Sequence, residues 1–333
     1  MKNFIINTIN ELFKAIKTYL FRKKEDGNFK RLAIARYGTF IANKFLLGYT
    51  QKLWGVSCEQ LSEQVAGKRL KGLDVQTFIK ELVSTKNDKT THLDGSFHYP
   101  TKGIGQLFEN MSADLSLELN TPVESIKIID NKITEITAGG NQYRADKFVS
   151  SLPMPLLIQM MDIPLSDKVK NGLKRLQFVD LYLVAIQINK PSITTNASLY
   201  FPDKETIFTR VVEPKNRSKA LATANKTMLV AEVPVLTGKS IADDVLIEKT
   251  KKQLLKTDLF KVEEIESVSL RKIKYAYPVL TKEYQNDLAE IKEILSSIDN
   301  LYLTGRVANF TYQHIHDHFK EGQEIADQIS NGK

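Results

Sequence analysis

Hydrophobic residues change their spacing along the chain near residue 95. Before it, as in the apolar stretch 32–47, they recur at the mixed three- and four-residue intervals of a helix, and Gly48 ends that stretch. After Gly95, short apolar stretches follow the two-residue period of β-strands. The pattern therefore predicts helices in residues 1–95 and mainly strands in the remainder.

Residues 115–150 are typical of a β-meander, in which neighbouring strands are joined by tight turns. Asp130 with Asn131, and then Gly139 with Gly140, are residues that such turns favour. Isoleucines alternate along the stretches around the first turn, which indicates one buried face. The expected strands are 115–119, Val123–Ile129, 133–137 and 142–150.

Residues 154–299 predict an antiparallel sheet with helices. Most of 178–278 has the pattern of strands, and helical patterns interrupt and close this stretch, which favours an antiparallel sheet over a series of β-α-β units. The expected strands are 181–188, 206–212, 227–233 and 265–275, and the expected helices are 241–255, 282–298 and one that ends near Met161. The expected fold class is therefore mixed α/β with α+β character.

The first 24 residues are amphipathic, and their pattern fits two interpretations. The apolar positions that share one helical face are Ile5, Ile9, Leu12, Phe13, Ile16 and Leu20. A helix packed on the protein and a basic helix lying on a membrane surface both fit, the second because of the basic run 22–24. Glu11 and Lys14 interrupt any signal-peptide core. We therefore expect a cytoplasmic protein, with peripheral membrane contact through residues 1–24 as the alternative.

Composition narrows the class of protein. With 333 residues, 42% of them hydrophobic and 26% charged, the chain has the composition of a soluble globular protein with two domains. The net charge of +8 is spread without a basic–aromatic stripe, so nucleic acid is not an expected partner. Cys58 is the single cysteine, which excludes a disulfide framework and fits a reducing compartment.

The segment from residue 300 onward carries the most specific chemistry. An apolar strand runs into Gly305 and Arg306, and an aromatic loop then leads into an amphipathic helix. Gly305 allows the backbone to approach a ligand closely, and the Arg306 guanidinium can pair with a phosphate through two hydrogen bonds. The helix that follows directs its first N–H groups at the same place. The segment therefore predicts an anion site.

This segment resembles the C-terminal cofactor-binding segment of the flavin-containing amine oxidoreductases. That superfamily includes amine oxidases, protoporphyrinogen oxidase and, more distantly, UDP-galactopyranose mutase. Other stretches are similar to the family in the same order, so the likeness spans nearly the whole chain. They are Arg36-Tyr37-Gly38 with residues 49–55, residues 99–107, 121–126, 145–153 and 275–278.

The resemblance implies a domain arrangement and a set of cofactor contacts. A residual Rossmann-like FAD-binding domain with the β-meander is expected at 96–153 and 300–333. The substrate domain is expected to have a helical part at 1–95 and the antiparallel sheet at 154–299. The cofactor-binding residues would be Val123, whose backbone meets the adenine of FAD, together with Gly305, Arg306 and His316.

Alternatives remain open for two of these residues. Arg306 also fits a surface or inter-domain ion pair, and the residues around His316 also fit a helix start in which Asp317 acts as the cap. His314, His316 and His318 have alternate spacing, but a loop entering a helix does not keep all three on one side. We therefore expect no metal site, and the sequence singles out no catalytic residue.

A Gly-rich dinucleotide loop, with which proteins of this superfamily begin, is missing from the sequence. The pair Gly103 and Gly105 does not supply it, because Phe108 stands where the third glycine is needed and Pro100 precedes the pair. We therefore expect an N-terminally incomplete chain that does not retain FAD by itself. An upstream Rossmann fragment or a partner chain would complete it.

The functional hypothesis that follows is an FAD-dependent oxidoreductase resembling amine oxidases and protoporphyrinogen oxidase. Its substrate would be a small molecule, and the flavin would carry most of the chemistry. Two alternatives belong to other classes. One is a flavoenzyme resembling UDP-galactopyranose mutase, which uses reduced flavin as a nucleophile. The other is a non-catalytic remnant or binding subunit.

Overall fold

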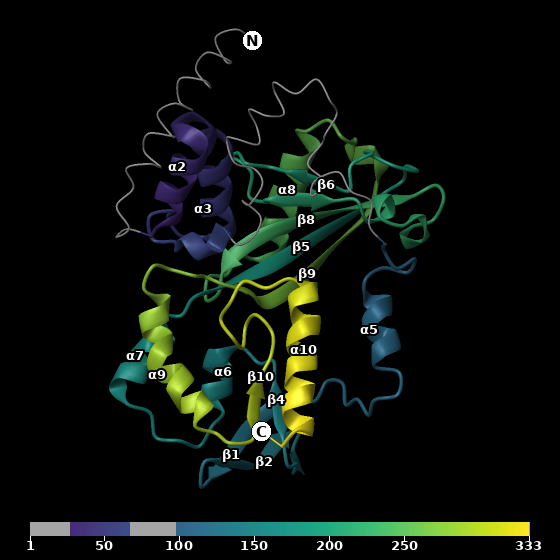
Figure 1. The fold of residues 1–333 in the computed structure, drawn as a ribbon. Coiled ribbons are helices and arrows are strands. Elements are labelled where there is room, and N and C mark those ends of the chain that lie inside the picture. The colour runs from purple at the N-terminus through teal and green to yellow at the C-terminus, as the bar shows by residue number, and fades with distance from the viewer. Residues whose placement is uncertain (1–26, 67–97, 333) are drawn as a thin grey trace, which may run out of the picture. The chain divides into compact units, whose positions relative to one another are not determined.

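The computed structural model describes residues 27–66 and 98–332, so the predictions for residues 1–24 lie outside the described residues. The chain forms two units that each combine segments distant in sequence (Figure 1). The first unit contains Met1–Leu115 and Val179–Lys274, and the second contains Ser116–Phe178 and Tyr275–Lys333. No helix in the described ranges is long and apolar enough to cross a membrane.

The described N-terminal part of the first unit is helical, as the spacing predicts. Helix α2 (Phe29–Ile41) continues through a π-helical turn (Ala42–Leu47) into α3 (Gly48–Trp54). The expected end at Gly48 is therefore wrong, because this glycine adopts ordinary right-handed helical angles. The helix ends at Gly55, which has the left-handed conformation that glycine reaches most easily.

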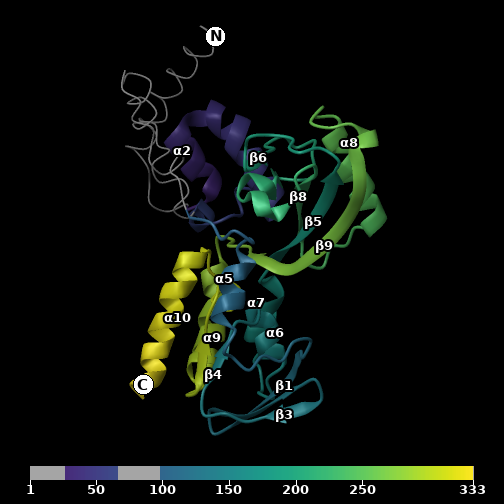
Figure 2. The same ribbon diagram turned by 90° about the vertical axis from the view of Figure 1, so that its right-hand side faces the viewer.

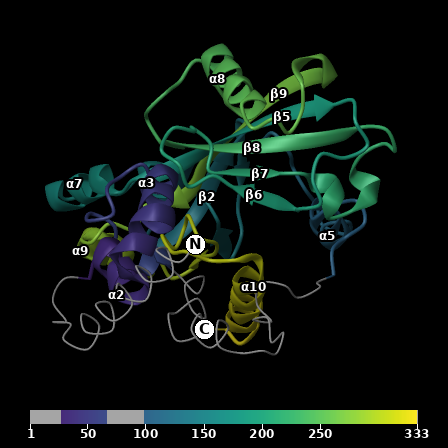
Figure 3. The same cartoon turned by 90° about the horizontal axis from the view of Figure 1, so that it is seen from above.

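The sheet of the first unit has five strands in the order β6-β7-β8-β5-β9 (Figure 3). The strands are β5 (Phe178–Ile188), β6 (Ser198–Tyr200), β7 (Arg210–Val212), β8 (Thr227–Leu236) and β9 (Ile265–Pro278). The pairs β5–β8, β7–β8 and β6–β7 are antiparallel, as the sequence predicts. Every second residue of β8 is buried, which follows from the alternation of side chains across a sheet.

Helix α8 (Asp243–Leu255) covers one face of this sheet and completes the core. Leu246 and Leu254 are fully buried in one cluster with Ile186 and Leu229 of the strands. The remaining helices of the described first unit are short. They are η2 (Glu63–Ala66), α5 (Gly105–Met111), η3 (Pro214–Asn216), η4 (Lys219–Leu221) and η5 (Val262–Glu264).

The strand expected at 206–212 is restricted to its last three residues, because the Lys52 ammonium organises the preceding residues as a loop. Its Nζ donates hydrogen bonds to the carbonyl oxygens of Phe201 and Asp203, both at 2.7 Å, and to Thr206 Oγ1 at 2.8 Å. Burial lowers the pKa of Lys52 to about 8, and Asp203 opposes this decrease. These oxygen atoms therefore accept hydrogen bonds from a lysine of helix α3 instead of from the backbone of a neighbouring strand.

Replacing Gly55 with alanine should destabilise the first unit by about 2–4 kcal/mol. Gly55 has φ +70°, and a Cβ atom there would lie 2.6 Å from Leu236 Cγ. Left-handed backbone costs an alanine roughly 1–2 kcal/mol, and overpacking adds about 1–3 kcal/mol. The fluorescence of Trp54, the single tryptophan, reports unfolding in urea. Gly238→Ala is the control, since φ is +89° and nothing lies within 4 Å. Equal losses for the two variants would contradict the contact with Leu236.

The second unit contains the predicted meander, now as three antiparallel strands. They are β1 (Val123–Ile129), β2 (Lys132–Ala138) and β3 (Asn141–Tyr143), in the order β1-β2-β3. Asp130 and Asn131 have φ of +50° and +59°, which is the backbone of the predicted tight turn. The end of helix α6 (Met154–Gln159) lies beside β1, where Ile126 N–H donates to Met160 O at 2.7 Å (Figure 2).

The strand expected at 115–119 does not form. Leu115, Leu117 and Leu119 keep their alternate spacing, but 57–79% of each is exposed. No described strand pairs with them, and an apolar alternation becomes a strand only where a partner accepts its hydrogen bonds. The expected strand 142–150 is also divided. It forms β3 and β4 (Phe148–Ser150), and the residues between them do not pair with a neighbouring strand.

Strand β10 (Leu301–Leu303) pairs with β4 in parallel, although about 150 residues separate them. Phe148 N–H donates to Asn300 O at 2.8 Å, and Thr304 N–H donates to Ser150 O at 3.0 Å. The Asn300 side chain also bridges to the meander, with hydrogen bonds to the N–H and C=O of Ile133 at 2.8 and 2.9 Å. The C-terminal strand therefore lies beside β4 and is linked through Asn300 to the meander.

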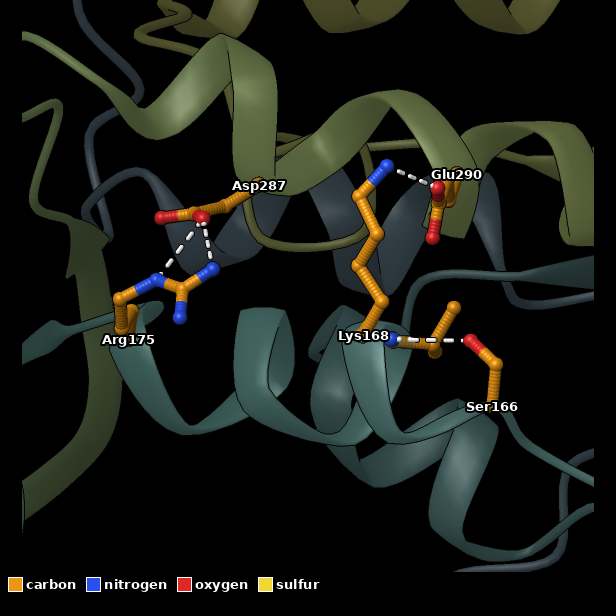
Figure 4. Close-up of polar contacts among 6 residues, drawn as sticks. Ser166, Lys168, Arg175, Asp287 and Glu290 are labelled. Atoms are coloured by element: carbon orange, nitrogen blue, oxygen red, sulfur yellow. Dashed lines mark hydrogen bonds and ion pairs between the residues drawn. The ribbon is translucent and has the colours of Figure 1, made fainter.

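Helices α7 (Asp167–Arg175) and α9 (Tyr284–Ser296) pack side by side in the second unit (Figure 4). Arg175 Nε and Nη2 donate to Asp287 Oδ1 at 2.9 and 2.6 Å, and Lys168 pairs with Glu290. Ser166 caps α7 by accepting the N–H of Val169 at 3.2 Å. Because Arg175 and Lys168 are largely exposed, these pairs orient the helices and contribute little stability.

Candidate functional site

The predicted anion-binding segment forms a loop between β10 and the last helix, α10 (Ile315–Ser330). Gly305 has φ +85°, a conformation that side chains rarely adopt, so glycine is needed for the chain to leave the strand at this angle. Phe310 is fully buried and fixes the far side of the loop. Its ring packs edge-on against Phe178 and is stacked with Tyr284, at centroid distances of 5.2 and 5.8 Å.

Glu321 of α10 gathers the polar groups of this loop around its carboxylate. Oε2 accepts the Gly305 N–H at 2.7 Å and the Thr304 hydroxyl at 3.0 Å. Oε1 accepts the side-chain amides of Asn309 at 2.7 Å and Gln313 at 3.3 Å. The N–H of Gly305 is therefore used inside the protein, and the contribution of Gly305 to a ligand site is its backbone conformation.

Arg306 places its guanidinium against an aromatic ring. Its Cζ lies 4.6 Å from the centroid of the Tyr277 ring, within the range of a cation–π interaction. Within residues 27–66 and 98–332 it makes no hydrogen bond and no ion pair. The described part of the chain thus gives Arg306 a fixed position and leaves its hydrogen-bond donors for another group. The alternative of an ion pair has no support in this part of the chain.

An aromatic row continues from Tyr277 toward the start of α10. Tyr277 stacks on Tyr312 with centroids 6.5 Å apart, Tyr312 meets His314 edge-on at 5.5 Å, and His314 stacks on His316 at 5.7 Å. The His316 side chain is 70% exposed and lies 3.4 Å from a carboxylate oxygen of Asp317. His316 therefore stands at the exposed end of the row.

Asp317 starts the helix, as one of the two interpretations of this region predicts. Its Oδ2 accepts the N–H of His314 at 2.9 Å, and the His314 side chain in return accepts the N–H of Asp317. This capping box satisfies one of the free first-turn N–H groups of α10. A carboxylate now stands at the helix start, so Arg306 rather than the helix terminus offers the stronger donors for an anion.

Two buried polar atoms of the loop have no partner among the described residues. They are Thr311 Oγ1 and Gln313 Oε1. A buried polar group without a hydrogen bond costs about 1–3 kcal/mol, so such atoms mark places where a ligand or ordered water completes the structure. The amide oxygen of Gln313 can only accept a hydrogen bond, so the Arg306 guanidinium is the group of this loop that suits a phosphate.

Val123, the fourth predicted cofactor residue, is the first residue of β1 and is partly buried. It pairs with Ala138, and the register shifts between Val123 and Ser125. Val123 lies in the same unit as Gly305, Arg306 and His316, but no described contact joins it to their loop. The structure thus brings three of the four predicted residues together.

The histidines near residue 316 do not assemble a metal site within the described residues. No group of three or more His, Cys, Asp or Glu side chains there has the geometry to hold a metal ion. His314 and His316 stack face to face, and His318 lies 3.9 Å from Glu321. These contacts give the three histidines different surroundings.

The fold and the loop define a protein of the flavin-containing amine oxidoreductase superfamily. The family model for UDP-galactopyranose mutase matches residues 44–312, and the chain belongs to that family. Among curated proteins, no match to the chain was found. The superfamily expected from the sequence is therefore confirmed, and within it the family that the sequence suggested as the more distant member is the one that matches.

Solved structures agree with this fold. The crystal structure of a reduced UDP-galactopyranose mutase matches with a TM-score of 0.78 and 20% identity, covering 92% of this chain and 68% of the other. A protoporphyrinogen oxidase candidate from Exiguobacterium sp. 255-15 has a TM-score of 0.67 and 15% identity, covering 97% and 72%. A triple mutant of putrescine oxidase has a TM-score of 0.50 and 15% identity, covering 70% and 54%. These likenesses show that the chain shares its fold with these proteins.

Sequence reasoning missed Glu321 as the centre of the loop. A glutamate in an amphipathic helix is usually a solvated residue, and 16 residues separate Glu321 from Gly305. One signal was present, since Glu321 lies four residues after Asp317 and therefore on the face of α10 that starts at the cap. The spacing alone does not identify the acceptor of the Gly305 N–H.

Proposed function

We propose that this protein is a flavin-dependent sugar-nucleotide mutase in which Arg306 binds a phosphate group of FAD. The observation that carries the proposal is the position of Arg306. Its guanidinium is held on the Tyr277 ring, is unpaired within the described residues, and lies in a loop that also contains two unsatisfied buried oxygens. Arginine binds phosphate through a fixed fork of N–H donors, which suits this position.

The mutase interpretation replaces the oxidoreductase hypothesis as the first choice because of the family match. That match extends from residue 44 to residue 312 and so includes Arg306. When bound, reduced flavin supplies a nucleophilic ring nitrogen, whereas the residues of this chain hold and orient the molecules. Arg306 would bind phosphate, Val123 would meet the adenine through its backbone, and the exposed His316 would lie toward the flavin ring.

The sugar nucleotide that we propose as substrate is UDP-galactopyranose. The assay incubates the flavin-loaded protein with UDP-galactopyranose and dithionite and separates the sugar nucleotides by chromatography. We expect the five-membered-ring isomer to appear only under reducing conditions. Flavin reduction by an amine in the absence of dithionite would instead support the oxidoreductase hypothesis. If neither occurs in protein that carries stoichiometric flavin, the binding-subunit hypothesis would replace both.

A further α/β segment is proposed to complete the FAD site. The sequence contains no Gly-rich dinucleotide loop, and strands β4 and β10 form a parallel pair that has no further neighbour within the described residues. Val149 in β4 is 52% exposed. Parallel strands are normally covered on both sides, so this pair is suited to receive additional parallel strands. The segment would be an upstream Rossmann fragment or a partner chain.

A further inference from the structure

The first unit contains an open pocket of about 770 Å³ that shares no residue with the Gly305–Arg306 loop. The residues that line it are Pro191, Ser192, Lys215, Asn216, Arg217, Ser218, Lys219, Ala222 and Ala224. Three of them are cations, and none is acidic. The volume falls in the range of small-molecule sites and is larger than a single inorganic ion needs.

Lys215 holds two of the loops that form this pocket. Its ammonium donates to the carbonyl oxygens of Pro191 at 2.8 Å, Thr223 at 2.7 Å, Ala224 at 3.0 Å and Lys226 at 3.0 Å. All four acceptors are neutral, so the positive charge of Lys215 is fixed without being neutralised by these contacts. Lys215 therefore ties the loops of the pocket wall together and places a positive charge in it.

Glu213, which precedes the pocket residues Lys215 to Lys219, fixes a neighbouring loop. It is 1% exposed, and its carboxylate accepts the N–H groups of Ile193 and Thr194 at 3.0 and 2.9 Å and the hydroxyl of Thr227 at 2.7 Å. Asn216 Nδ2 also donates to it, at 3.1 Å. One buried carboxylate beside three cations leaves about two positive charges at the pocket.

Arg217 and Lys219 provide the unpaired donors. Arg217 Nε is buried and has no hydrogen-bond partner, and its Nη2 makes only a 3.3 Å contact with Ser198 Oγ. The Tyr99 ring, 6.0 Å from the guanidinium carbon, lies beside this side chain. No carboxylate among the described residues pairs with Arg217 or Lys219. A buried N–H of a charged group without an acceptor is costly, so the Arg217 guanidinium has hydrogen-bonding capacity that the described residues leave unused.

We propose that this pocket binds a small molecule through its phosphate group, with Arg217 and Lys219 as the principal contacts. A phosphate monoester carries about −1.5 to −2 charges at pH 7, which matches the charge that the pocket leaves uncompensated. The guanidinium of Arg217 can donate hydrogen bonds to two phosphate oxygens, and Lys219 adds a point charge. Pro191, Ala222 and Ala224 give the remainder of the molecule an apolar wall.

The test is a calorimetric titration with inorganic phosphate and with inorganic pyrophosphate. All titrations use the Arg306→Gln background, so that the loop after β10 does not contribute. We expect a Kd near or below ~1 mM for inorganic phosphate. Arg217→Gln should weaken binding by about 10- to 100-fold and Lys219→Gln by about 3- to 10-fold. Because the Lys219 side chain is exposed, its variant should keep the fold even if the Arg217 variant does not.

Arg271→Gln is the matched control, since Arg271 is an exposed arginine of the same unit outside the pocket. Its Kd should stay within about twofold of the background protein, as expected for a distant, screened charge. Titration with malate, a dianion without phosphorus, tests whether charge alone is enough for binding, and malate should bind more weakly than phosphate. The proposal is overturned if neither phosphate nor pyrophosphate binds at 10 mM ligand, roughly tenfold above the expected Kd. It is equally overturned if the three variants bind alike, or if malate binds as tightly as phosphate.

Discussion

FAD should bind about 10- to 100-fold more weakly to the Arg306→Ala variant than to the unchanged protein, measured in the flavin-loaded complex with its completing α/β segment. The reason is that charge-assisted hydrogen bonds to phosphate contribute about 1.5–3 kcal/mol. Arg306 has no competing acceptor in the described residues, so its donors are available to the cofactor. Fluorescence titration of the released and rebound flavin measures the change.

Two further variants test whether the loss of affinity comes from the guanidinium of Arg306 itself. Arg306→Lys keeps the charge but loses the planar fork, and it should recover only part of the affinity. Arg144→Ala removes an exposed arginine of the same unit, whose side chain is 78% exposed and pairs with Glu135, and it should leave the affinity unchanged. If Arg306→Ala and Arg144→Ala bind FAD equally well, Arg306 does not hold the cofactor.

The chain of 333 residues by itself should be colourless after desalting. A Gly-rich turn brings a helix N-terminus and several N–H contacts to the pyrophosphate, and losing three or four of them costs on the order of 5–10 kcal/mol. That corresponds to about 10⁴- to 10⁷-fold in affinity. Adding the α/β segment in trans should restore the flavin spectrum. Stoichiometric flavin in this chain alone would show that other residues hold FAD.

Glu321→Gln should lower the free energy of unfolding of the second unit by about 2–4 kcal/mol. The glutamine keeps the shape of the side chain but replaces one acceptor oxygen by an NH₂ group that faces the donors of the loop. Either Gly305 and Thr304, which share Oε2, or Asn309, which bonds Oε1, would then face the NH₂ group instead of an acceptor within 3.0 Å. Donors left without partners cost about 1–3 kcal/mol each, although not additively. The effect should be largest in the residues that follow β10.

Hydrogen exchange is the appropriate measurement, because two units need not unfold in one step. Peptides covering 301–314 should exchange faster in Glu321→Gln, and those covering the sheet of the first unit should not change. Glu324→Gln is the matched control, since Glu324 lies on the same helix, is 60% exposed and pairs only at 3.7 Å with Lys320. Equal protection of the loop in both variants would mean that Glu321 does not organise it.

Short-range patterns explain which parts of the fold were predictable. The alternation along Thr227–Leu236 and the turn at Asp130 depend on residues close in sequence, because side-chain direction and backbone angles are local properties. The same patterns failed at 115–119 and over the first four residues of 206–212. Both stretches have strand-like spacing, but whether a strand forms depends on a partner that the local sequence does not specify.

The sequence by itself determined the mixed fold class, the superfamily and the importance of Gly305 and Arg306, because a strand, a glycine and an arginine in succession have a local chemical meaning. Only the tertiary structure decided how those residues are used. It directs the Gly305 N–H to Glu321, places the Arg306 guanidinium on Tyr277, and pairs β10 with a strand about 150 residues earlier. Such contacts join residues far apart in the chain, and their energies depend on packing that no local pattern contains.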